Sequence, residues 1–312
     1  MKTAFLFPGQ GAQVVGMGSD IAQEFPEAAK TFETANDILG FDLKKLCFEG
    51  PVEILNTTSI SQPGIFVTSA AFLHVLNSES ATSGLKPDVT AGLSLGEYTA
   101  LYAAGVISFE EALVLVSKRG QAMQRASEAT QGSMVSIIGL DDEKTGELCN
   151  EAAQGSLLSP VNFNCPGQIV ISGHKGACKR AVELAEKFGA IKAVELAVAG
   201  AFHTEMMAAA AAELANAIKN TDIKSPSDTK IIANINADYY QSGEKIASGL
   251  IKQLTCPILW QKCMEKLISQ GVEHFYEIGP GRVLTGLMRR INRKIKVFNI
   301  SSLDAVKKLM DS

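Results

Sequence analysis

The sequence has few of the residues that build disulfide frameworks or metal sites. Its six cysteines are scattered over 312 residues: Cys47, Cys149, Cys165, Cys178, Cys256 and Cys263. No C-x-x-C pair occurs, and no histidines lie near the cysteines at metal-ligand spacing. We therefore expect no structural metal, no bound cofactor and a reducing cytoplasmic environment.

Positive charge and long apolar runs are also scarce. Lysine and arginine total 29 against 33 aspartates and glutamates, which gives a formal net charge of -4. A general nucleic-acid binder needs an excess of positive charge, so no nucleic-acid partner is expected. The first residues, MKTAFLFPGQG, hold too short an apolar run for a signal peptide or a membrane span, so no membrane association is expected either.

The remaining composition is that of a soluble globular protein, with 46% hydrophobic and 20% charged residues. The patterns predict strands over 3–7, 89–92, 230–234 and 274–278. They predict helices over 18–25, 27–38, 62–76, 205–219, 245–254 and 260–270, and one that begins at Ser108, where Glu111 completes a capping box. Strands and helices that alternate in this way indicate an α/β fold.

The stretch from 133 to 196 follows a different order. It predicts strands over 134–139, 159–164, 168–172 and 191–196, with helices over 142–153 and 175–188. The order β-α-β-β-α-β is that of a ferredoxin-like unit. We therefore expect a small domain at 128–198, inserted into a larger α/β domain formed by 1–127 and 199–312.

A serine between two glycines, Gly92-Leu93-Ser94-Leu95-Gly96, lies between a predicted strand and a predicted helix. In this context G-x-S-x-G is typical of a nucleophile elbow, in which a tight turn presents the serine hydroxyl. The amide after the nucleophile can then donate to an oxyanion. The pattern also occurs in plain tight turns, but the strand-turn-helix context favours a catalytic Ser94.

A nucleophilic serine needs a base, and the chain has four histidines. His74 lies in the middle of an apolar helix, His174 in a polar turn and His274 on a strand, positions typical of structural or solvated histidines. His203 lies in a loop of small residues before the helix predicted from Glu205. The positive end of that helix would help keep the imidazole neutral. By elimination, His203 is the candidate base.

The group that orients this histidine stays open at this point. Asp141 gives the chain order Ser-Asp-His of an α/β-hydrolase, but its strand is predicted in the small domain. A backbone or amide carbonyl is the alternative. A neutral partner would leave a milder base, which suits an enzyme that must not hydrolyse its own acyl-serine.

Arg119 shares the apolar stripe of the helix that begins after Ser108, because it follows Val116 by three residues and Leu115 by four. The guanidinium could reach the surface along its own stem. Alternatively it waits inside for a substrate carboxylate, which its planar fork can hold with two hydrogen bonds.

Seven motifs in order along the chain resemble the malonyl-CoA:acyl-carrier-protein transacylases of type II fatty acid synthesis, and also the acyltransferase domains of polyketide synthases. The motifs are FPGQGAQ at 7–13, GLSLGE at 92–97, KRG at 118–120, NFNCPGQIVISG at 162–173, AFH at 201–203, QLTCPILW at 253–260 and EIGPG at 277–281. The resemblance implies an α/β-hydrolase-like large domain with a parallel sheet and a ferredoxin-like small domain.

The resemblance also implies a ping-pong transfer of malonyl from CoA through Ser94 to the phosphopantetheine thiol of acyl carrier protein. We expect the protein to be a monomer. His203 would act as base and then as acid, and the main-chain carbonyl of Gln253 would orient it. The amides of Gln10 and Leu95 would form the oxyanion hole, and Arg119 would bind the malonyl carboxylate.

Two positions bear on specificity. Many members of the family have histidine where this chain has Leu93, so any contact of that ring is absent here. Phe202 before the base is similar to the malonyl-selective version and can exclude an α-methyl group, an effect of about 1–3 kcal/mol. A serine hydrolase or thioesterase, and a non-catalytic subunit that binds the carrier protein, are the alternatives.

A basic run near the end of the chain is the last feature of note. It comprises Arg282, Arg289, Arg290, Arg293, Lys294 and Lys296. Such runs are usually solvated faces. We hypothesise that part of this run binds the acidic carrier protein or the CoA phosphates.

Overall fold

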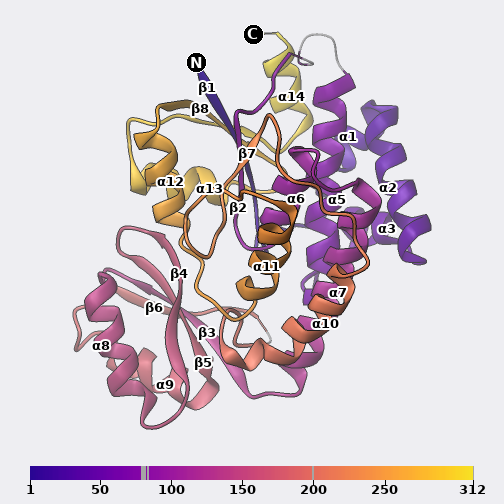
Figure 1. Cartoon of the computed structure of the whole chain (residues 1–312). Coiled ribbons are helices and arrows are strands. Elements are labelled where there is room, and N and C mark those ends of the chain that lie inside the picture. Colours follow the sequence, from indigo (N-terminus) through magenta and orange to yellow (C-terminus); the bar gives the residue numbers. More distant parts are fainter. Residues whose placement is uncertain (79–81, 83, 199, 312) are drawn as a thin grey trace.

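The computed structural model describes residues 1–78, 82, 84–198 and 200–311, which form two sheets with helices around them (Figure 1). The larger sheet has five strands in the order β7 (Lys230–Ile231), β2 (Val89–Gly92), β1 (Lys2–Phe7), β8 (Val272–Ile278) and β9 (Val297–Ile300). All neighbouring strands are parallel, and Phe7 at the end of β1 lies opposite Gly92 at the end of β2. The α/β class is confirmed.

Helices cover both faces of this sheet, which is why its central strand is apolar on both sides. Along β1, Phe5 and Phe7 belong to one core cluster, while Ala4 and Leu6 belong to another on the opposite face. The first cluster takes side chains from α1 (Ser19–Glu24), α2 (Pro26–Leu39), α3 (Leu43–Glu49), α4 (Val52–Leu55), α5 (Thr58–Ser78), α6 (Gly96–Ala103), α7 (Phe109–Glu128), α10 (Ala208–Ile218), α11 (Gly243–Gln253) and α14 (Leu303–Met310). The second takes them from α12 (Trp260–Ser269) and α13 (Val283–Ile291).

Helix α5 is long and apolar enough to cross a membrane if only length and composition are counted. In the structure, however, 83% of its most apolar window is buried inside the protein, mainly against α7 and α2. A buried central helix of a globular protein has the same composition. We therefore describe α5 as the core helix on this face of the sheet.

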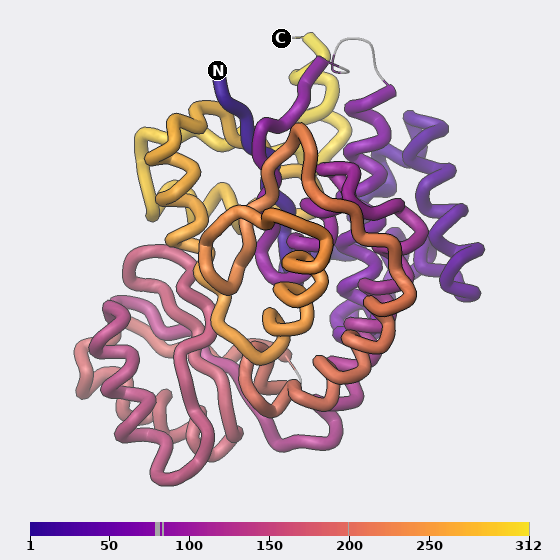
Figure 2. Tube along the Cα trace, in the orientation of Figure 1, coloured from indigo at the N-terminus to yellow at the C-terminus, as the bar shows by residue number. Residues whose placement is uncertain are grey.

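The smaller sheet is antiparallel and has the order β4 (Leu158–Cys165), β5 (Gln168–His174), β3 (Gly132–Ile138) and β6 (Lys192–Glu195). Its two helices, α8 (Asp142–Ala153) and α9 (Lys175–Leu184), share a separate core cluster with the strands. This part of the trace forms a lobe at the lower left of Figure 2. The ferredoxin-like order is confirmed. The domain limits at 128–198 stay a prediction, and residue 199, where the second part of the large domain is expected to begin, lies outside the described residues.

Several element boundaries differ from the expectation. The helix expected over 205–219 is a 3₁₀ turn, Glu205–Met207, followed by α10, and the strand expected over 230–234 ends at Ile231. The chain folds back after β7, where Ala237 takes a left-handed φ of 54° and Ile232 pairs with Tyr239. The pattern also missed β9 and α3, α4, α13 and α14, some of which are very short.

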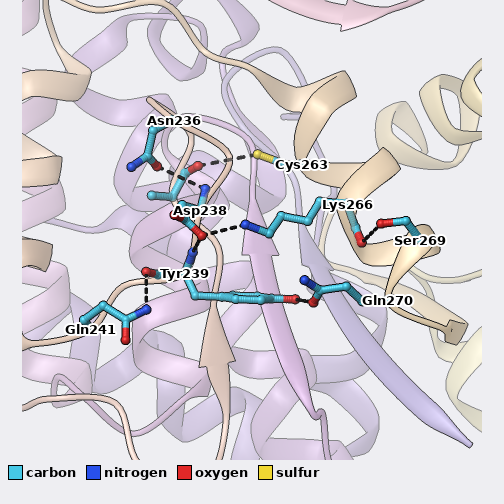
Figure 3. A network of polar contacts seen from close by, with 9 residues as sticks. Asn236, Asp238, Tyr239, Gln241, Cys263, Lys266, Ser269 and Gln270 are labelled. Carbon is cyan, nitrogen blue, oxygen red and sulfur yellow. Dashed lines mark hydrogen bonds and ion pairs between the residues drawn. The ribbon is translucent and has the colours of Figure 1, made fainter.

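The turn after β7 is held against α12 by side-chain contacts (Figure 3). Lys266 Nζ lies 2.6 Å from Asp238 Oδ1 and 5.2 Å from the centre of the Tyr239 ring. The Cys263 thiol donates to the Ala233 carbonyl at 3.5 Å. These contacts fix the turn from outside. Its inner side carries Asn234, which hydrogen-bonds to Ser94.

Candidate active site

Ser94 lies in a sharp turn between β2 and α6, with a left-handed φ of 50°. Few non-glycine residues adopt this conformation, and those that do are often at functional sites. The two flanking glycines are required by packing. A Cβ atom on Gly92 would lie 1.9 Å from the carbonyl carbon of Gly96, and one on Gly96 would lie 2.1 Å from the Phe7 carbonyl oxygen. The predicted elbow geometry is therefore present.

His203 lies beside this turn, also at a left-handed φ, of 61°. Its Nε2 is 3.0 Å from Ser94 Oγ, and its Nδ1 is 2.6 Å from the main-chain oxygen of Gln253. Because a carbonyl can only accept, Nδ1 carries the proton and Nε2 is free to accept from the serine. Asp141, the alternative orienting group, instead caps α8 by accepting from the Lys144 amide at 2.9 Å.

The imidazole is neutral, but for a different reason from the one expected. Burial, and next the positive charge of Arg119, lower the pKa of His203 to about 4, while the hydrogen bond to Gln253 acts in the opposite direction. The positive end of a helix from Glu205 is not the cause, because only a 3₁₀ turn follows and α10 begins at Ala208.

Arg119 does not reach the surface, since its side chain on α7 is only 1% exposed. Nη1 donates to Gln62 Oε1 at 2.7 Å, and Nη2 donates to both Ser94 Oγ and Gln253 Oε1 at 2.9 Å. Among the described residues, Arg119 forms no ion pair, and its Nε has no protein acceptor. A buried cation without a carboxylate partner, in contact with the serine hydroxyl, is suited to an anionic substrate group.

A cavity of about 350 Å³ opens onto these groups, between the two sheets. Ser94, His203 and Arg119 line it together with Gln10 and Phe202. The amides of Gln10 and Leu95 donate to no protein acceptor within the described part of the chain, so they are available to an oxyanion. The structure thus brings all the residues predicted for the site to one place, while their individual roles stay predictions.

The smaller sheet contributes residues to this cavity that the sequence analysis missed. Met134 and Val170 line it with Asn162 and Asn164. Over the described residues, the side-chain oxygens of both asparagines are buried and have no protein donor. Asn162 and Asn164 are two positions apart on β4, and side chains two positions apart on a strand point to the same face, so the sequence could have placed them together.

Asn234 was missed as well, because it belongs to no pattern that carries chemistry by itself, and Glu97, the last residue of the GLSLGE motif, was given no role. Asn234 lies in the turn after β7 and is fully buried. Its Oδ1 accepts from the Ser94 amide at 2.7 Å, and its Nδ2 donates to the Gly92 carbonyl at 2.8 Å. One side chain thus satisfies both polar groups of the turn that presents Ser94.

We expect Asn234→Ala to destabilise the protein by about 2 kcal/mol or more, because it leaves the Ser94 amide and the Gly92 carbonyl buried without partners. The serine turn should also lose its fixed geometry, which lowers kcat. Urea unfolding and steady-state rates measure the two effects. Asn236→Ala is the matched control on the exposed side of the same turn, with an expected change within about 0.5 kcal/mol. Equal effects of the two substitutions would contradict this role.

Known proteins resemble the chain over its whole length. The acyl transferase domain family matches residues 4–307. A Bacillus subtilis (strain 168) protein named malonyl CoA-acyl carrier protein transacylase is 42% identical over 306 residues, which cover 98% of this chain and 95% of the relative. An Escherichia coli (strain K12) protein of the same name is 44% identical over 288 residues and 92% of each chain.

Solved structures agree with these relatives. A malonyl CoA-acyl carrier protein transacylase from Coxiella burnetii superposes with a TM-score of 0.95 at 36% identity, covering 100% of this chain and 97% of that chain. A malonyl-transacylase in complex with a type II polyketide synthase acyl-carrier protein also has a TM-score of 0.95, at 40% identity, and covers 100% and 99%. Fold and sequence therefore point to the same group of proteins.

Proposed function

The chain belongs to the acyl transferase family, and on that basis we propose that it transfers malonyl from CoA to the phosphopantetheine thiol of acyl carrier protein. The observation that carries the proposal is the contact of Ser94 Oγ with both His203 Nε2 and Arg119 Nη2. A base on one side of the hydroxyl activates it, and a cation on the other side selects an acyl group that ends in a carboxylate.

In the first half-reaction, Ser94 Oγ attacks the thioester carbonyl carbon and His203 Nε2 takes the hydroxyl proton. The carbonyl oxygen becomes an oxyanion near the free amides of Gln10 and Leu95. When the tetrahedral adduct collapses, the carbon–sulfur bond breaks, and His203 returns the proton to the departing CoA sulfur. Malonyl is then esterified to Ser94.

The second half-reaction runs the same steps in reverse order, with the thiol of acyl carrier protein as the nucleophile. His203 accepts the thiol proton, the thiolate attacks the malonyl-serine ester, and the proton returns to Ser94 Oγ. The group that orients His203 is the neutral Gln253 carbonyl rather than a carboxylate. The imidazole is therefore a weak base, which favours a thiol over water as the attacking group.

Substrate selection follows from the same cavity. We place the malonyl carboxylate on the guanidinium of Arg119, where it would replace the contact of Nη2 with the serine. Phe202 lines the cavity beside His203 and would restrict α-substituents. The transfer needs no metal and no cofactor, because malonyl-CoA and phosphopantetheine enter as substrates.

The remaining assignments belong to the same proposal. We place the protein in the cytoplasm as a monomer, with residues 128–198 as one structural unit. Of the basic run, Arg290 is occupied, because it donates to Gln168 Oε1 at 2.8 Å and to the carbonyls of Pro166 and Gly167 at 3.3 Å. The proposal that part of the run binds acyl carrier protein or the CoA phosphates therefore rests on its other members.

Intact mass spectrometry after brief mixing with malonyl-CoA tests the proposal. We expect a malonyl adduct on the wild-type protein and on Ser117→Ala, a control on α7, and none on Ser94→Ala. Addition of acyl carrier protein should discharge the adduct and produce malonyl carrier. Steady release of CoA without an adduct would indicate a hydrolase instead, and neither adduct nor turnover would indicate a binding subunit.

A further inference from the structure

Glu97 is a buried carboxyl group on α6, one turn beyond Ser94, and the transfer steps give it no role. It is 0% exposed. The Tyr240 hydroxyl donates to its Oε1 at 2.6 Å, and Gln253 Nε2 donates to its Oε2 at 2.6 Å. Among the ion pairs of the described residues none involves Glu97. Its direct polar contacts are therefore hydrogen bonds to neutral groups, and Arg119 acts on it only from a distance.

The side-chain amide of Gln253 connects this carboxyl group to Arg119. Its Oε1 accepts from Arg119 Nη2 at 2.9 Å, while its Nε2 donates to Glu97 and, at 3.0 Å, to the Ser94 carbonyl. A reversed amide would put its NH₂ against the guanidinium and its oxygen against the carboxylate. The two charges thus fix the orientation of Gln253, and only this one amide separates them.

Arg119 faces a different charge balance with and without substrate. In the empty site Glu97 is the negative group that acts on it, and a buried guanidinium needs such compensation. A malonyl carboxylate on Arg119 would bring a second negative charge into the same enclosed space. Two carboxylates that share one cation raise the pKa of one another, so one of them tends to take up a proton.

We propose that Glu97 is the resident counter-charge of Arg119, and that it takes up a proton from solvent when the malonyl carboxylate binds this arginine. The inference rests on the proposed function, because it needs an acyl group that carries a carboxylate. Burial already raises the pKa of Glu97 to about 7 in the empty enzyme, so both protonation states are accessible near neutral pH. The Tyr240 hydroxyl can donate to the carboxylate and accept from the acid, which accommodates either state.

The other titratable groups around Glu97 do not change their protonation state near neutral pH. Burial raises the pKa values of Tyr98, Tyr240 and Cys263, which stay neutral. Burial lowers the pKa of His203 to about 4, so this group is neutral as well. Arg119 remains a cation. These groups are Arg119 on α7, Tyr98 on α6, Tyr240 in the segment after β7, Cys263 on α12 and, next to Arg119, His203.

The test is to count protons while Ser94 becomes malonylated. The wild-type protein is mixed with malonyl-CoA in weak buffer with a pH indicator, and the same sample is analysed by intact mass. Acyl transfer itself is proton-neutral at pH 7, because the serine proton ends on a CoA thiol whose pKa is about 8.5. We expect an uptake of about 0.5 proton per malonylated site at pH 7 and about 0.1 at pH 6, where Glu97 is already mostly protonated.

Two variants separate Glu97 from other buried carboxyl groups. Glu97→Gln should abolish the uptake. Glu277→Gln should leave it unchanged, although Glu277 is also 0% exposed and accepts from the Leu284 and Thr285 amides.

Each result decides one question. A malonyl adduct that forms without proton uptake, or with the same uptake at pH 6 and pH 7, overturns the inference on the wild-type protein alone, whether or not Glu97→Gln folds. Uptake that persists in Glu97→Gln overturns it too. If no malonyl adduct forms at all, it is the proposed function that has failed.

Discussion

His203→Ala is expected to lower kcat for malonyl transfer by about 10²–10⁴-fold, the usual range for loss of a positioned general base. The serine hydroxyl would keep its contact with Arg119 but would have no group to take its proton. Stopped-flow acylation with malonyl-CoA measures the effect. His174→Ala is the control, because His174 is exposed in the smaller sheet. A loss of less than about tenfold in His203→Ala would mean that another group removes the proton.

The pH dependence of the wild-type enzyme tests the protonation state of His203. His203 must be neutral to accept the serine proton, and burial lowers its pKa to about 4. Protonation of His203 should therefore not lower kcat as the pH falls from 7 to 5, and kcat should drop only as the pH passes through about 4. An ordinary exposed histidine would lose activity near 6.5. An acid limb at 6–7 in kcat/KM would contradict the neutral, buried imidazole.

Much of the site could be predicted from the sequence because its main parts are local. The elbow is a five-residue pattern between a strand and a helix, and the packing around Gly92 and Gly96 shows why no larger residue fits there. The spacing of apolar residues placed Arg119 on the apolar stripe of one helix but left open whether its guanidinium reaches the surface, and the structure shows that the side chain is buried. The capping box at Ser108 set the start of that helix, and the structure has it as predicted.

The parts that could not be predicted depend on contacts between residues far apart in the chain. Asn234 meets the Ser94 turn across 140 positions, and Gln253 meets Glu97 across 156. No periodicity connects such pairs. The low pKa of His203 was expected from a helix end, yet its main causes are burial and the charge of Arg119, which depend on the tertiary arrangement. Short elements such as β7 are likewise set by the turn that follows them.

Arg119→Ala should change the choice of acyl group rather than lower all rates alike. In the proposed reaction the guanidinium binds the malonyl carboxylate through charged hydrogen bonds. Their loss should cost about 3 kcal/mol of transition-state stabilisation, so kcat/KM for malonyl-CoA should fall roughly 100-fold. Acetyl-CoA has no carboxylate, and with wild-type protein its methyl group would face a buried cation to which it cannot hydrogen-bond. We therefore expect acylation by acetyl-CoA to be unchanged or faster in the variant. Intact mass and acylation rates with both thioesters give the ratio.

Two further substitutions test whether the changed ratio of malonyl to acetyl rates comes from the position and shape of the cation. Arg119→Lys keeps the charge but cannot make two parallel hydrogen bonds, so its malonyl rate should lie between those of the wild type and Arg119→Ala. Arg125→Ala removes an exposed arginine of the same helix, paired with Glu213, and should leave both rates unchanged. If Arg119→Ala reduced the malonyl and acetyl rates equally, Arg119 would support the serine rather than select the substrate. The ratio of the two rates, rather than either rate alone, therefore assigns its role.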